Sequence, residues 1–118
     1  MDERRVVITG LGCVTSLAES ADDLFAALCE GKSGISTIES FDTSAYPVRF
    51  GGEAKAFDVT TYIDRRESKR MDRFTQFATA ASSQAVADSG LDFSTEDVSR
   101  AGVVIGTGIG GKSEAKRS

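Results

Sequence analysis

The glycine-rich segment near the C-terminal end of the sequence has the residue types that bind phosphate groups. Residues 106–113 read Gly-Thr-Gly-Ile-Gly-Gly-Lys-Ser and match the P-loop pattern G-x-x-x-x-G-K-[S/T] at every fixed position. In a P-loop, backbone N–H groups surround the phosphates, while the lysine contacts phosphate and the hydroxyl contacts magnesium. The first six residues also match G-x-G-x-x-G, a dinucleotide-binding turn. A third interpretation is a packed glycine loop inside a larger enzyme, since glycine lets the backbone turn where side chains would clash.

Both nucleotide-binding interpretations lack their second half in this sequence. A P-loop needs a helix beginning at its lysine and an acidic residue after another strand to help hold magnesium. Only residues 114–118 follow Ser113, and no apolar run elsewhere ends in Asp. The dinucleotide turn needs an acidic residue about 20 positions later, which would lie beyond residue 118. A nucleotide-binding module at residues 106–113 therefore remains an alternative, and we do not favour it.

The cysteines offer little chemistry. Cys13 and Cys29 lie far apart in the sequence, and the chain contains no histidine. A reactive cysteine needs a neighbouring base or cation, and a zinc site needs more cysteine or histidine ligands than this chain has. We predict no catalytic residue, no metal site and no cofactor, and we interpret Cys29 as a half-buried apolar residue near the end of a helix.

The most basic run of the chain, residues 65–73, is a candidate protein-binding surface. Arg66, Lys69 and Arg70 have the i, i+3, i+4 spacing that places side chains on one helix face. The net charge of −4, from 18 acidic and 14 basic residues, gives no general attraction to nucleic acid or to an anionic membrane. A solvated helix face is the alternative interpretation of this run.

The elements that would position these residues form an α/β pattern. We predict strands at residues 5–8 and 101–105, each followed by glycines, and expect them to be parallel neighbours joined by a right-handed crossover. Residues 34–55 are expected to form a long loop with short extended pieces, and residues 58–64 one turn of helix.

Two helices are expected between these strands. One begins at the N-cap Ser20, with Asp23 three residues later, and ends at Gly31. The other begins at the N-cap Asp72 and ends at Gly90. The apolar positions of the second helix predict a face buried deep in a larger assembly, and they are Phe74, Phe77, Ala78, Ala81 and Ala85.

Six segments in order along the chain carry a resemblance to a known family. The sequence resembles the N-terminal portion of 3-oxoacyl-(acyl-carrier-protein) synthases, the elongating beta-ketoacyl synthases of the thiolase-like superfamily. The matching segments are residues 6–15 (VVITGLGCVT), 31–35 (GKSGI), 41–42 (FD), 69–74 (KRMDRF), 88–91 (DSGL) and 102–111 (GVVIGTGIGG). They extend over nearly the whole chain, which makes the resemblance far more specific than one glycine motif.

The resemblance implies a fold, a reaction and a set of site residues. The implied fold is the N-terminal part of a layered αβαβα thiolase-like enzyme, with residues 1–118 an incomplete N-terminal domain and no second domain. The implied reaction is acyl transfer by decarboxylative Claisen condensation in fatty-acid or polyketide synthesis. The family's nucleophilic cysteine and two histidines would follow Gly111, so we expect this chain alone to be inactive. The lack of histidine agrees, because imidazoles assist this decarboxylation.

The same resemblance implies binding residues and partners, and the N-terminal sequence predicts a location. It places Ile109, with Gly108 and Gly110, at the border of an acyl-chain pocket, and it places carrier-protein docking on Arg66, Lys69 and Arg70. We expect acyl carrier protein as the partner and a homodimer in the intact family. The N-terminal residues have neither a signal peptide nor a spanning helix, which predicts a cytoplasmic protein.

Overall fold

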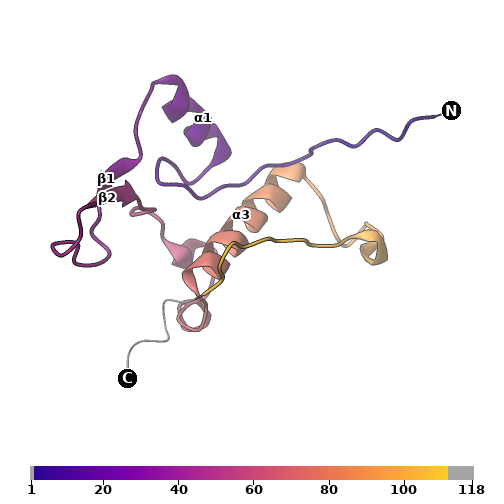
Figure 1. Ribbon diagram of the computed structural model, residues 1–118. Coiled ribbons are helices and arrows are strands. Elements are labelled where there is room, and N and C mark those ends of the chain that lie inside the picture. Colours follow the sequence, from indigo (N-terminus) through magenta and orange to yellow (C-terminus); the bar gives the residue numbers. More distant parts are fainter. Residues whose placement is uncertain (1, 112–118) are drawn as a thin grey trace. The chain divides into compact units, whose positions relative to one another are not determined.

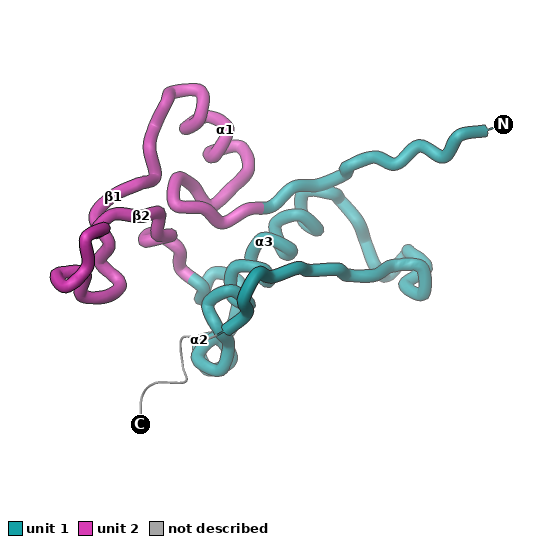
Figure 2. Tube along the Cα trace, in the orientation of Figure 1, with its two compact units in different colours: residues 1–12, 59–118 teal, residues 13–58 magenta. Residues whose placement is uncertain are grey.

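The computed structural model describes residues 2–111 (Figure 1). Its helices are α1 (Ala21–Cys29), α2 (Arg65–Ser68) and α3 (Arg73–Ser89), and its strands are β1 (Ile35–Thr37) and β2 (Phe50–Gly52). Short 3-10 helices lie at Val59–Thr61 (η1) and Val98–Arg100 (η2). The chain divides into two compact units, coloured separately in Figure 2. We call residues 13–58 the hairpin unit, and the residues up to 12 together with those from 59 onward the α3 unit.

In the hairpin unit, α1 begins and ends as the sequence predicts. The Ser20 hydroxyl donates to Asp23 Oδ2 at 2.9 Å, and the Asp23 N–H donates back to Ser20 Oγ at 3.2 Å. These bonds satisfy a backbone donor that the first turn of a helix leaves open. After the helix, Gly31 takes a left-handed φ of 69°, a conformation that costs glycine little.

The long loop of the hairpin unit contains the short extended pieces that the sequence predicts. β1 and β2 pair antiparallel, with Ile35 opposite Gly52 and Thr37 opposite Phe50. Beyond the hairpin, the Glu53 carboxylate accepts hydrogen bonds from the N–H groups of Glu39 and Ser40 at 2.9 and 3.1 Å. Side-chain acceptors thus replace strand pairing where the strands are only three residues long.

Acid should loosen these loop contacts. Hydrogen bonds from Ser40 and Glu39 lower the pKa of Glu53, and hydrogen bonds from Ser44 lower the pKa of Asp42. A carboxyl with a lowered pKa in the folded state stabilises it above the unfolded pKa and loses that contribution as pH falls through the folded pKa. We therefore expect the Ser40 and Ser44 amide resonances to move on acidification below about pH 4. An NMR pH titration checks this, and Glu53→Gln should remove the response at Ser40 while leaving the response at Ser44. A Ser40 amide that titrates equally in that variant would contradict the assignment.

The α3 unit is built on the longest helix. α3 follows Asp72 and ends at Gly90, whose φ is 69°, so both predicted boundaries are confirmed. Gln76 Nε2 donates to the Ser68 carbonyl at 2.9 Å, and Gln84 Nε2 donates to Tyr62 Oη at 2.9 Å. These two bonds connect α3 to the α2 and η1 region that precedes it.

The predicted burial of the alanine face concerns a larger assembly and stays a prediction, and within this chain the face is only partly covered. Ala78, Ala81 and Ala85 are only half-buried, and Ala80 is instead the residue of α3 with no exposed surface. The small side chains of this face let another backbone segment approach α3 closely. A Cβ on Gly12 would lie 2.8 Å from Gln84 Cβ and closer still to the Ala81 carbonyl oxygen.

The N-terminal segment rests on α3 through its glycines. A Cβ on Gly10 would lie 2.6 Å from the Ser89 nitrogen, so both Gly10 and Gly12 are required for close approach. Between them, the Leu11 N–H donates to Asp88 Oδ2 at 2.9 Å. The sequence predicts a turn that closes a strand at these glycines. They are instead the surface by which the segment contacts the helix.

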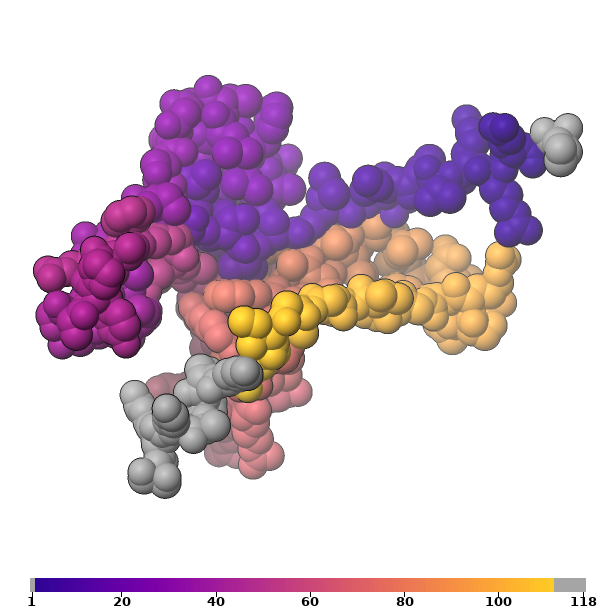
Figure 3. All heavy atoms as spheres, in the orientation of Figure 1, coloured from indigo at the N-terminus to yellow at the C-terminus, as the bar shows by residue number. Residues whose placement is uncertain are grey.

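The two predicted main strands are absent from the described residues, and so is their parallel pairing. Residues 6–8 and 101–105 do not form strands, and Val6 is 95% and Val104 99% exposed. In Figure 3 the first residues form an arm one chain thick. A β-branched run becomes a strand only when a neighbour pairs with its N–H and C=O groups. Within the described part of the chain, no strand lies beside either run. The same residues contain no helix long and apolar enough to cross a membrane.

Candidate functional site

The glycine loop at residues 106–111 presents Ile109 to solvent. The Gly110 N–H donates to Thr107 Oγ1 at 3.2 Å, and Gly110 has a φ of 74°. This closes a tight turn with Ile109 near its tip, 77% exposed. A Cβ on Gly108 would meet no atom within 4 Å. The turn therefore displays an aliphatic side chain with open space beside it, an arrangement suited to contact an apolar ligand.

The end of this loop lies against the start of α3. A Cβ added to Gly111 would overlap the carboxylate of Asp72, so a side chain at residue 111 would have to displace that carboxylate. Asp72 precedes the first residue of α3, yet its side chain makes no cap hydrogen bond to that helix. Sequence reasoning indicates Asp72 only as a cap and misses this contact. The signal available in the sequence is the second glycine of the pair Gly110 and Gly111.

The segment before the loop runs beside α3. Ile105 and five α3 residues line a hollow of about 560 Å³, mostly apolar, and the α3 residues are Thr79, Ser82, Ser83, Val86 and Ala87. The hollow lies within the α3 unit.

The basic residues are exposed as predicted, but their helix is shorter than their spacing implied. α2 ends at Ser68, with Lys69 as its C-cap in a helical conformation, and Arg70 follows in a turn. Arg66, Lys69 and Arg70 are all exposed and make no ion pair within the described part of the chain. Nearby, the Arg73 guanidinium lies 4.8 Å from the centre of the Phe77 ring. The result is a positively charged surface at the start of α3.

The two cysteines belong to the hairpin unit. Cys13 is half-buried and burial raises its pKa, which disfavours the thiolate. Cys29 is exposed, so our interpretation of it as half-buried is wrong. It lies near the end of α1, whose one buried residue is Ala27. Neither position has the features of a nucleophile.

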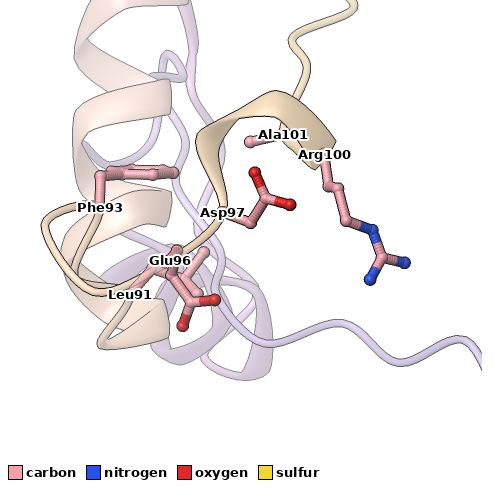
Figure 4. A pocket seen from close by; sticks show the side chains of 6 residues that line it. All are labelled: Leu91, Phe93, Glu96, Asp97, Arg100 and Ala101. Carbon is pink, nitrogen blue, oxygen red and sulfur yellow. The ribbon is translucent and has the colours of Figure 1, made fainter.

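A second hollow, which the sequence did not suggest, follows α3. It measures about 270 Å³ and is lined by Leu91, Phe93, Glu96, Asp97, Arg100 and Ala101 (Figure 4). Its carboxylates and guanidinium are exposed, and Asp97 also accepts hydrogen bonds from Ser99 at 3.1 and 2.6 Å. The Asp97 carboxylate therefore already serves the local turn.

The P-loop alternative depends on residues that the structure does not cover. Lys112 and Ser113 lie outside the described residues, and no group of three acidic or cysteine side chains in residues 2–111 could hold a metal ion. Of the P-loop pattern at residues 106–113, the structure describes the glycine turn at residues 106–111. In this turn, the Gly110 N–H donates to Thr107 Oγ1 and the Asp72 carboxylate lies beside Gly111.

We expect ATP with magnesium to bind this chain no better than background. Within residues 2–111, no group of acidic side chains is placed to hold the magnesium that a P-loop requires. Isothermal titration calorimetry checks this, with Lys112→Ala as the matched variant. Micromolar binding that Lys112→Ala abolishes would support the nucleotide-binding module instead.

The chain matches one protein family over almost its full length. The family described as "Beta-ketoacyl synthase, N-terminal domain" matches residues 3–118. A relative named 3-oxoacyl-[acyl-carrier-protein] synthase 2 from Synechocystis sp. is 48% identical over 94% of this chain. A protein of the same name from Vibrio harveyi is 44% identical over the same share. The chain spans 27% of the length of each of these relatives.

A solved structure agrees with the sequence comparisons. The ishigamide ketosynthase/chain length factor superposes with a TM-score of 0.71 at 34% identity, covering 77% of this chain and 23% of that one. The superposition identifies the arrangement of elements as that of a ketosynthase, although residues 6–8 and 101–105 are not strands here. The chain therefore belongs to the beta-ketoacyl synthase family and has the fold of the N-terminal part of its α/β, thiolase-like N-terminal domain.

Proposed function

We propose that residues 1–118 are part of a 3-oxoacyl-(acyl-carrier-protein) synthase that elongates acyl chains by decarboxylative condensation with malonyl-carrier protein. The observation that carries the proposal is the 48% identity to an enzyme of that name across 94% of the chain. In this proposal the residues belong to one N-terminal domain. The nucleophile and the histidines of the reaction are supplied from outside residues 1–118, since these contain no histidine.

The first contribution of this part is a border of the acyl-chain pocket. Ile109 supplies an aliphatic side chain on a turn that Gly108 and Gly110 leave uncrowded. Burying such a side chain against an acyl chain is worth about 1.5 to 3 kcal/mol. A larger or smaller residue at this position would alter the space left for the acyl chain.

The second contribution is docking of acyl carrier protein. Arg66, Lys69 and Arg70 form an exposed positive surface without intramolecular carboxylate partners in the described residues. An acidic partner would meet these charges without first breaking an ion pair, and the attraction would act mainly on the association rate. The alternative, a solvated charged surface with no partner, makes the opposite prediction about binding.

A titration of labelled acyl carrier protein tests the docking surface. We expect weak binding at low salt that is lost in the Arg66→Glu, Lys69→Glu, Arg70→Glu variant, and that falls as ionic strength approaches about 0.1 M, where the screening length is about 10 Å. A matched control reverses three other exposed charges, Arg4→Glu, Arg5→Glu and Arg100→Glu, and should bind as the parent chain does. Equal binding by the parent and the docking variant, or binding by neither, would leave the basic surface as solvated.

A further inference from the structure

Asp72 and Gly111 bring together two segments that lie far apart in the sequence. Asp72 belongs to the basic segment before α3, and Gly111 ends the turn that carries Ile109. The space that a side chain at residue 111 would need is occupied by the Asp72 carboxylate. The contact places the carboxylate directly on the backbone of the loop.

The carboxylate is not engaged by its own helix. Aspartate at an N-cap position ordinarily accepts a hydrogen bond from a backbone N–H in the first turn. The Asp64 side chain does so at α2, accepting from the Arg66 N–H at 2.9 Å. The Asp72 side chain makes no such bond at α3. The N-cap aspartates of these two successive helices thus differ in what their carboxylates contact.

We propose that Asp72 is a positioning residue that fixes the base of the Ile109 turn by its contact with the Gly111 backbone. Within the turn, the Gly110 N–H donates a hydrogen bond to Thr107 Oγ1, which sets the shape of the turn but not its place on the protein. The contact with Asp72 sets that place, because α3 is the longest rigid element of the unit. This inference rests on the proposed function only in assigning Ile109 to an acyl pocket.

If Asp72 holds the base of the turn, the position of Ile109 depends on the position of Asp72. Misplacing a substrate-contacting group by about 1 Å can cost a large factor in rate, so a loop that borders a pocket needs a rigid attachment. Asp72 follows Lys69 and Arg70 within three residues. The docking surface and the attachment of the pocket loop therefore share one short segment.

A fluorescence experiment on the whole chain tests the positioning role without any ligand. The chain has no tryptophan, so Ile109→Trp introduces a single indole reporter at an exposed position. In this background we expect Asp72→Ala to lower the anisotropy of the introduced indole and to increase its quenching by acrylamide. Asp72→Asn, which keeps the shape and an acceptor oxygen, should restore the parent values.

A double-mutant cycle makes the test specific to this contact. Gly111→Ala alone should loosen the turn, because its methyl group collides with the carboxylate, but in the Asp72→Ala background the same change should have little further effect. Such non-additivity is the signature of residues in contact. Unchanged anisotropy of the indole reporter in Asp72→Ala, or effects of the two changes that simply add, would overturn the proposal.

Circular dichroism separates positioning from helix capping. Because Asp72 makes no cap bond, Asp72→Ala should leave helix content unchanged, whereas Asp64→Ala removes a cap that exists. A loss of α3 helicity that accompanies the loosening of the indole reporter would show that Asp72 acts through the helix and would overturn the inference. Since no acyl ligand or carrier protein is used, these outcomes do not depend on the proposed function.

Discussion

Replacing Gly12 by alanine is expected to detach the N-terminal segment from α3. The added methyl group would lie 2.8 Å from Gln84 Cβ and 2.9 Å from the Ala81 carbonyl carbon, and nearer still to the Ala81 oxygen. Helix backbone cannot move aside as a flexible side chain can, so the segment itself must shift. The shift would break the Leu11 to Asp88 hydrogen bond of 2.9 Å. Overpacking of this kind typically costs about 1 to 3 kcal/mol.

Hydrogen exchange at the Leu11 amide measures this effect directly. In the parent chain the amide is bonded to Asp88 and should be protected, and in Gly12→Ala it should exchange at the rate of an open segment. Gly102→Ala is the matched control, because a Cβ there meets nothing within 4 Å. Protection of Leu11 that survives in Gly12→Ala would show that the glycine is not required for the close approach.

The isolated chain is expected to self-associate through its two uncovered apolar segments. Val6 is 95% and Val104 99% exposed, and both lie in β-branched runs without a neighbouring strand in the described residues. Extended apolar backbone of this kind is a template for pairing with another chain. Burying one valine is worth about 1.5 to 3 kcal/mol, so Val6→Lys with Val104→Lys should weaken association at least about tenfold.

Sedimentation velocity over a concentration series checks this expectation. The matched control introduces two lysines at exposed polar positions, Ser36→Lys and Thr61→Lys, and should associate as the parent chain does. Added salt should leave the association intact, because apolar burial is not screened as charge attraction is. A monodisperse monomer that unfolds cooperatively would contradict the prediction.

Local signals in the sequence predict the helices well. Ser20 with Asp23 marks where α1 begins, and the glycines at residues 31 and 90 mark where α1 and α3 end, because capping depends on groups only a few residues away. The same local reasoning overestimates α2, which stops at Ser68 although the basic spacing continues to Arg70. Helix length depends on packing as well as on spacing, and a helix this short has little propensity to extend by itself.

The strands could not be predicted reliably from their own residues. Residues 6–8 and 101–105 have strand composition, yet they remain unpaired in the described part of the chain, because pairing is a property of two segments. The candidate site also combines residues that the sequence identifies with a contact that it does not reveal. The sequence identifies Ile109 and its glycines, and it cannot show that Asp72 occupies the space beside Gly111.

The amino-acid sequence alone indicates the family, the ends of the main helices, and the candidate loop and basic residues. These features depend on residue type and on short spacing. Two other features require the folded chain: Gly10 and Gly12 serve close approach to α3, and Asp72 meets Gly111. The physical reason is that these contacts join residues about 40 to 80 positions apart, and local propensity carries no information about which distant backbone will lie within van der Waals reach.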